Sequence, residues 1–343
     1  MFYGYSDTTA MLPLETFPTE GPLPDKLARL TTPGPGGILL GEPVRIFFPT
    51  LDGSPQHAQI LEGCGRYPLV ILAHGQCLRD EQPYQEWFEL PAILARCGYV
   101  VILPDLDLGA PSGNEIEQRL IGKLAGWARS DWEHKDLVMP RPATALVGHS
   151  WGGGLLGHVA ADFPGSYAAY VSLSGVEVPG DLSRSPIPKL MTWGADLSLE
   201  VLGAQISQLD AFAQPVHVAE FHDAGHWDYL PAGRSACDAD ESGRPARGTC
   251  TLTPYLAADI VAGFLTRYLR PEGVRTPPWP WSSLLRIPPS LRPPLGARML
   301  LTPEQEFYAG GHLQAWQGVT AREDCGVTLR WRVNGSSGEL VHT

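Results

Sequence analysis

The sequence has 343 residues, of which 43% are hydrophobic and 18% charged, a composition typical of a globular protein with one large domain and additions or with two domains. Its 37 acidic residues outnumber its 25 basic ones, and the net charge of -12 argues against nucleic acid and anionic membrane surfaces as partners. No apolar run approaches the roughly 18 residues of a transmembrane helix, and residues 1–20 carry acids and prolines where a signal peptide needs basic and then apolar residues. We therefore expect a cytoplasmic protein, or a secreted one if a signal peptide has been removed.

The chain divides by composition into four parts. Residues 1–42 are rich in Pro, Gly and Thr and predict a surface arm with at most one short helix. Residues 43–270 alternate short β-branched or aromatic runs with helical stretches, and form the predicted main domain. Residues 271–299 hold eight prolines and predict a stiff linker. Residues 300–343 predict a small β extension, because an alternating run meets the turn dipeptide Asn334-Gly335.

The elements predicted between residues 43 and 270 define the fold class. The predicted strands are 44–48, 69–73, 99–103, 143–147, 168–173, 189–193 and 216–221. The predicted helices are 84–97, 115–128, 150–161, 199–212 and 255–269. Nearly continuous apolar strands that alternate with helices indicate an α/β fold, with a mostly parallel sheet covered by helices on both faces.

The most informative motif is Gly-His-Ser-Trp-Gly at residues 148–152, which follows an apolar run and precedes a helical stretch of small residues. A nucleophilic serine needs such a strand-to-helix turn, and Gly148 and Gly152 would let neighbouring backbone pass close to Ser150. The helix that follows would direct free N–H groups toward a developing oxyanion. The pattern therefore predicts Ser150 as a catalytic nucleophile.

A serine hydroxyl becomes reactive when a histidine takes its proton and a carboxylate orients that histidine. His226 directly follows the last predicted strand, and Asp196 follows the strand before it, so both are predicted at the same edge of the sheet as Ser150. Alternatives remain open at this point. Glu177 and Asp181 compete for the role of acid, and His222 lies four residues before His226.

Six segments carry a resemblance to a known family: 44–49, 68–75, 97–102, 148–153, 194–196 and 225–226. On these residues the chain, from about Pro43 to Leu269, resembles the α/β-hydrolase superfamily, in the branch of chlorophyllase-like esterases, platelet-activating-factor acetylhydrolase-like proteins and bacterial cutinase-like polyester hydrolases. The resemblance implies Ser150 as nucleophile, Asp196 as acid and His226 as base. It also implies a small-molecule or lipid-like carboxylic ester as substrate, and no cofactor.

Further residues of the site follow from the same resemblance. The oxyanion hole would use the backbone N–H groups of Gln76 and Trp151. Trp227, His149 and Trp151 are candidates to line the acyl pocket. The polyester-hydrolase branch carries an aromatic residue in place of Gln76 and a tryptophan where this chain has residues 173–177, and both differences argue against a polyester substrate.

The same residues also fit other activities and sites. The same triad would serve an acyltransferase, an amidase or a peptidase, and an inert hydrolase-fold binding protein is the alternative from another class. No metal site is predicted, because the acidic run at 238–243 lacks the glutamate that closes a calcium loop. Cys237 and Cys250 bracket a polar loop that a disulfide would close with about 3 kcal/mol of stabilisation, and two free thiols are the alternative. The sequence does not determine the oligomeric state.

Overall fold

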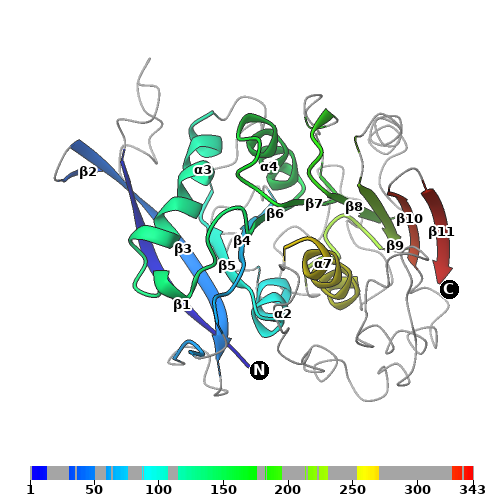
Figure 1. Cartoon of the computed structure of the whole chain (residues 1–343), viewed down its shortest axis with the longest axis horizontal. Coiled ribbons are helices and arrows are strands. Elements are labelled where there is room, and N and C mark those ends of the chain that lie inside the picture. Colours follow the sequence, from blue (N-terminus) through cyan, green and yellow to red (C-terminus); the bar gives the residue numbers. More distant parts are fainter. Residues whose placement is uncertain are drawn as a thin grey trace, which may run out of the picture.

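A computed structural model describes residues 2–13, 31–34, 37–50, 59–62, 65–75, 87, 89–106, 115–175, 182, 184–194, 213, 215–221, 224–230, 253–269, 327–333 and 336–342. The described strands belong to one eleven-stranded sheet (Figure 1). They are β1 (Phe2–Pro13), β2 (Thr31–Gly34), β3 (Gly37–Thr50), β4 (Leu69–Ala73), β5 (Val100–Pro104), β6 (Thr144–His149), β7 (Ala169–Leu173), β8 (Lys189–Gly194), β9 (Val216–Phe221), β10 (Val327–Val333) and β11 (Ser336–His342). The described α-helices are α2 (Glu89–Arg96), α3 (Glu115–Ser130), α4 (Trp151–Asp162) and α7 (Thr253–Leu269), and a short 3₁₀ helix, η4, spans Lys135–Leu137.

The order of the strands is β1-β3-β5-β4-β6-β7-β8-β9-β10-β11, with β2 paired to β3 outside this path. The six strands from β5 to β9 in this order run parallel to one another, whereas β1, β3, β10 and β11 pair antiparallel with their neighbours. Parallel strands end at the same edge of a sheet, so the segments that follow β4, β6, β8 and β9 meet at one edge. Ligands of open α/β sheets bind at this edge, outside the carboxyl ends of the strands.

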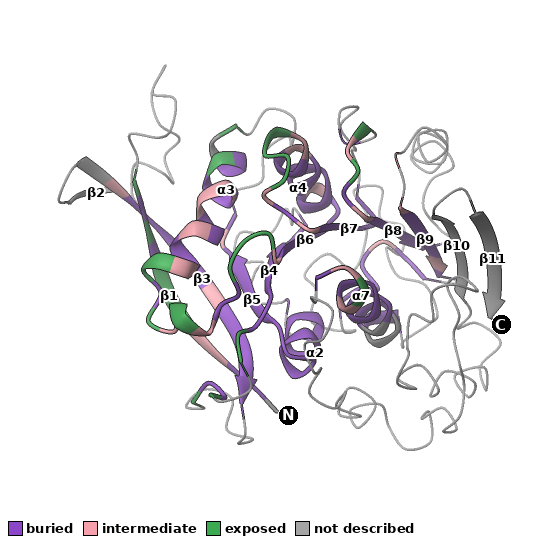
Figure 2. Ribbon diagram, in the orientation of Figure 1, coloured by how far each residue is buried: buried purple, intermediate pink, exposed green. Residues whose placement is uncertain are grey.

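Helices cover both faces of the sheet. In Figure 1, α3 and α4 lie on one face, and α2 and α7 lie on the other. Along β4, successive side chains alternate between two apolar clusters, so that Leu69 and Ile71 pack with α3 and α4, while Val70 and Leu72 pack with α2 and α7. Figure 2 shows the central strands buried throughout. This arrangement confirms the predicted α/β fold class.

The seven strands predicted between residues 44 and 221 all occur, six of them with bounds within two residues of those predicted. The predicted helix at 84–97 is shorter and begins at Glu89, and the helix predicted at 199–212 lies outside the described residues.

The prediction of an arm without strands is wrong for residues 2–13. They form β1, which pairs with the whole length of β3 from Phe2 opposite Thr50 to Pro13 opposite Leu39. Tyr3, Ala10 and Leu12 are buried. The local sequence gives little strand signal, and it is pairing with a long, apolar neighbour that makes this segment a strand.

The predicted C-terminal hairpin is confirmed by β10 and β11, which pair from Val327 opposite His342 to Val333 opposite Ser336. β10 also pairs antiparallel with β9, so the extension continues the central sheet. The proline-rich segment 271–299 lies outside the described residues, and the division into domain and linker stays a prediction. Among the described helices, none is both long and apolar enough to cross a membrane.

Candidate active site

Ser150 stands alone between the end of β6 and the start of α4, in a backbone conformation with φ 52° and ψ -125°. Residues other than glycine rarely adopt a positive φ, and a strained turn of this kind is kept only when the surroundings hold it. The N–H of Ser150 donates to the carbonyl of Leu173 on β7 at 3.0 Å, and its own carbonyl accepts from the N–H of Gly153 at 2.9 Å. The turn is therefore held by β7 on one side and by α4 on the other.

The two glycines of the motif are required by close packing. A Cβ atom added to Gly148 would overlap the carbonyl of Gly152, and one added to Gly152 would stand 2.6 Å from the carbonyl oxygen of Ala73 on β4. Real Cβ atoms do not approach other atoms this closely, so neither position accepts a side chain. This confirms the reason that the sequence suggested for both glycines.

His226 begins a tight turn that follows β9. The carboxylate of Asp228 accepts from the N–H of Gly225 at 2.6 Å, and the N–H of Asp228 donates to the carbonyl of Gly225 at 3.1 Å. These reciprocal bonds close the turn around His226. Burial lowers the pKa of His226 to about 4, so its ring is neutral near pH 7 and is able to accept a proton.

His149, the residue before Ser150, connects the two turns. Its Nε2 donates to the carbonyl of His226 at 2.7 Å, and its ring centroid lies 4.8 Å from the His226 ring. Three more aromatic rings surround it, with centroids 5.1 Å away in Trp87, 4.9 Å in Trp227 and 5.5 Å in Tyr229. Burial, and then the nearby His226, keep the pKa of His149 well below its ordinary value, so this ring is neutral. Because Ser150 directly follows His149 in the chain, the hydrogen bond from His149 places the turn of His226 beside the turn of Ser150.

The segment after β4 also passes beside Ser150. His74 accepts from the N–H of Leu106 at Nε2 (3.1 Å), so its proton is on Nδ1, which donates to the carbonyl of Gly75 at 2.9 Å. A Cβ added to Gly75 would stand 3.0 Å from Cβ of Ser150 and 2.6 Å from Nδ1 of His149. His74 thus holds the backbone that leads to Gln76 against the turn of Ser150.

Tyr229 joins the turn of His226 to two strands. Its hydroxyl is hydrogen-bonded to Thr192 Oγ1 on β8 at 2.8 Å and accepts from Ser174 Oγ, just after β7, at 3.2 Å. Among the described residues other than glycine, Ser150 and Ser174 are the two with a positive φ. The sequence pointed to neither Tyr229 nor Ser174, since the bonds between them join segments far apart in the chain.

The structure therefore brings together four of the predicted site residues, Ser150, His149, His226 and Trp227. His149 is completely buried, so it supports the site from within rather than lining an open pocket. Trp151 is half-buried and packs against the cluster on the α3 and α4 face, whereas Trp227 belongs to the cluster on the opposite face. As the first residue of α4, Trp151 has a backbone N–H without an intrahelical acceptor.

The remaining predicted residues, Asp196, Gln76, Cys237 and Cys250, lie outside the described residues, as do the alternatives Glu177, Asp181 and His222. β8 ends at Gly194, so the chain leaves the sheet just before Asp196 at the edge that also carries Ser150. In the described part of the chain, no group of three or more His, Cys, Asp or Glu residues is placed to hold a metal ion.

Comparison with known proteins agrees with this architecture. No protein-family model matches the chain. Chlorophyllase-1 of Arabidopsis thaliana is 27% identical over 164 residues, which is 44% of this chain and 44% of that protein, so the similarity spans less than half of the relative. The structure of a ferulic acid esterase from Streptomyces cinnamoneus matches with a TM-score of 0.58 and 15% identity, over 80% of this chain and 93% of the esterase. The chain has the α/β-hydrolase fold, and the resemblance seen in the sequence is confirmed at that level.

Proposed function

We propose that the chain is a carboxylic ester hydrolase, with Ser150 as nucleophile, His226 as general base and Asp196 as the carboxylate that orients His226. The observation that carries this proposal is the strained turn of Ser150, tied through His149 to the turn of His226. The fold alone would not indicate an activity, because proteins with the same fold can have different functions or none as enzymes. The similarity to an esterase and to chlorophyllase-1 favours an ester over other acyl compounds.

The proposed reaction has two half-reactions with an acyl-enzyme between them. The Oγ of Ser150 attacks the carbonyl carbon of the ester while its proton moves to His226. The oxyanion accepts hydrogen bonds from the backbone N–H groups of Trp151 and Gln76. The alcohol leaves with the proton from His226, and water, activated by the same histidine, then releases the acid and restores Ser150.

Each described part has a function in this scheme. The N–H of Trp151 is available because it lies in the first turn of α4, and the dipole of that helix favours negative charge at this end. The ring of His226 is neutral near pH 7, and the carboxylate of Asp196 would stabilise the charged form that it takes on when it accepts the proton of Ser150. The substrate would be a small-molecule or lipid-like ester.

The test compares hydrolysis of p-nitrophenyl esters, from acetate to palmitate, by the wild type and by Ser150→Ala. We expect the variant to lose at least about a thousandfold in kcat, because the covalent step needs the hydroxyl. A fluorophosphonate probe should label the wild type on Ser150, as mapped by mass spectrometry. The dependence of the rate on acyl length would then place the natural substrate.

Ser174→Ala is the matched control, since Ser174 is also buried and also has a positive φ. It should still be labelled on Ser150. Labelling of the wild type that survives Ser150→Ala, or a wild type that is inert toward both the probe and every ester, would refute the proposal. Faster cleavage of p-nitroanilides than of the matching esters would assign the site to amides instead.

A further inference from the structure

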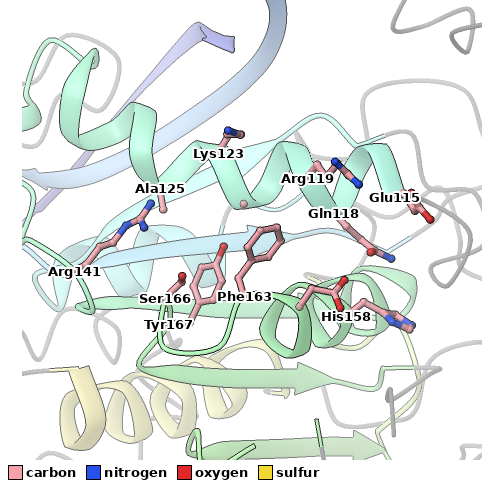
Figure 3. A pocket seen from close by; sticks show the side chains of 12 residues that line it. Glu115, Gln118, Arg119, Lys123, Ala125, Arg141, His158, Phe163, Ser166 and Tyr167 are labelled. Carbon is pink, nitrogen blue, oxygen red and sulfur yellow. The ribbon is translucent and has the colours of Figure 1, made fainter. Parts of the chain in front are cut away.

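A cleft of about 810 Å³ opens between α3 and the segment that joins α4 to β7 (Figure 3). This volume lies in the range of small-molecule binding sites. Its lining comes from α3, from Arg141, from the end of α4 and from the segment that follows α4. α4 has 12 residues, and at 1.5 Å per residue it is about 18 Å long, with Ser150 at its start and Asp162 at its end. The cleft is therefore separate from the candidate active site.

The middle of the cleft is apolar. Phe163 lies over Gly122 of α3, where an added Cβ would stand 3.2 Å from the phenyl ring. Its side chain is 37% exposed, one of two large hydrophobic side chains among the described residues that are this open to solvent. With Ala125 on α3, the ring offers an apolar surface on which a flat group could pack.

Two arginines and a tyrosine meet near one end of the cleft. The guanidinium of Arg129 donates to Met139 O at 2.7 Å, Ala125 O at 2.8 Å and Thr144 Oγ1 at 2.6 Å, all of them neutral acceptors. Burial, and then the positive charge of Arg141, lower the pKa of Arg129 to about 10. The two positive charges therefore lie close together.

The exposed arginine is the one that faces the cleft. Arg141 makes no hydrogen bond or ion pair with any described residue, and Ser166 and Tyr167 line the cleft near it (Figure 3). Burial raises the pKa of Tyr167, which keeps its phenol neutral and able to donate a hydrogen bond. The cleft therefore has a cationic end rich in donors and an apolar middle, and Glu115, Arg119 and His158 lie toward its far end (Figure 3).

We propose that this cleft binds a small organic carboxylate with a flat apolar body, such as an aromatic acid, its carboxylate at Arg141 and its ring against Phe163. A planar guanidinium pairs well with a carboxylate, and the hydroxyls of Ser166 and Tyr167 supply further donors. The bound anion would also balance the charge of Arg129. This site is independent of the proposed hydrolase activity.

The test uses the full chain carrying Ser150→Ala and three probes, benzoate, benzamide and acetate, with dissociation constants from ligand-observed NMR titration. Benzoate should bind at least about tenfold more tightly than benzamide, which lacks the charge, and than acetate, which lacks the ring. Arg141→Gln should weaken benzoate binding by at least about tenfold. Arg66→Gln, which removes an exposed positive charge outside the cleft, should leave it unchanged.

Three results would overturn the proposal: no binding of benzoate, equal binding of benzoate and benzamide, or equal affinity in the Arg141→Gln and Arg66→Gln variants. The last result would place the ligand elsewhere, including at the candidate active site. Because every measurement is made without the Ser150 hydroxyl, a failure here says nothing about ester hydrolysis, and a failure of the esterase test leaves this result intact.

Discussion

His149 acts on the candidate site through a single hydrogen bond, although it has no reacting atom of its own. A positive φ at a residue such as Ser150 costs about 1–3 kcal/mol, so the turn exists only because its neighbours hold it. The Nε2 donation to His226 and the aromatic rings around His149 supply part of that restraint. We infer that His149 is a positioning residue, which sets the distance between the Ser150 hydroxyl and the His226 ring.

Two substitutions at His149 separate this hydrogen bond from simple packing. His149→Phe keeps an aromatic ring but leaves the part-buried carbonyl of His226 without its donor, which costs about 1–1.5 kcal/mol. We expect kcat to fall by about tenfold or more with little change in KM. His149→Gln, whose amide reaches about as far as Nε2, should recover most of the loss. Steady-state kinetics check this, and equal kcat values in the two variants would assign His149 a packing role only.

At the scale of elements, the turn at residues 226–229 depends on the ends of β7 and β8. Tyr229→Phe removes the hydroxyl that contacts Thr192 and Ser174 and should destabilise the fold by about 1 kcal/mol. Because the same turn carries His226, kcat should also fall severalfold. Tyr99→Phe is a matched control, since Tyr99 is also buried and its hydroxyl is also hydrogen-bonded to a threonine, Thr266 Oγ1 at 3.0 Å, but on the face of α7.

We expect the two tyrosine variants to lose similar stability in thermal unfolding, and only Tyr229→Phe to lose activity toward p-nitrophenyl esters. A loss of kcat in both variants would mean that the activity follows global stability. An unchanged kcat in both would mean that the turn of His226 does not need its link to β7 and β8.

The elements that the sequence could predict are those whose signal is local. The strands β4 and β9 were predicted with the observed bounds, because their apolar runs are short and flanked by Pro, Gly or His residues. β1 was missed because its strand character comes from pairing with β3, which begins more than twenty residues later. Ser150 was predicted because the strand, turn and helix of the motif adjoin in the chain. Tyr229 and His74 were not assigned a role, since their partners come from other segments.

At the scale of the whole molecule, α4 separates two sites of different character. Ser150 lies at its start, at the carboxyl edge of the parallel strands, and the cleft of Arg141 lies toward its end. No sequence motif marks the cleft. Its residues come from α3, from the segment before β6, from the end of α4 and from the segment that joins α4 to β7, so the cleft exists only once these elements have packed. The closeness of Arg129 and Arg141 also depends on the fold, because a turn and the η4 helix separate the two residues in the chain.

Buried histidines make the stability of the whole fold depend on pH. Burial lowers the pKa of His217 to about 3 and that of His226 to about 4, whereas both would take up a proton near pH 6.5 in the unfolded chain. Between these values the unfolded state binds more protons, so the free energy of unfolding falls as the pH falls, by about 1.4 kcal/mol per pH unit for each group. This stabilisation is complete above pH 6.5 and is lost as the pH drops toward the pKa of the folded state.

His217 isolates one such contribution, because its ring is buried against Phe264 and its Nε2 is hydrogen-bonded to the Tyr268 hydroxyl at 2.7 Å. Gln at this position keeps a polar partner for Tyr268 but does not titrate. From pH 7.5 to pH 5.0 we expect the wild type to lose about 2 kcal/mol more unfolding free energy than His217→Gln. Urea unfolding at both pH values measures this difference, and all other titrating groups cancel because the two proteins share them. The same loss in both proteins would show that His217 takes up its proton in the folded state as readily as in the unfolded chain, which its burial argues against.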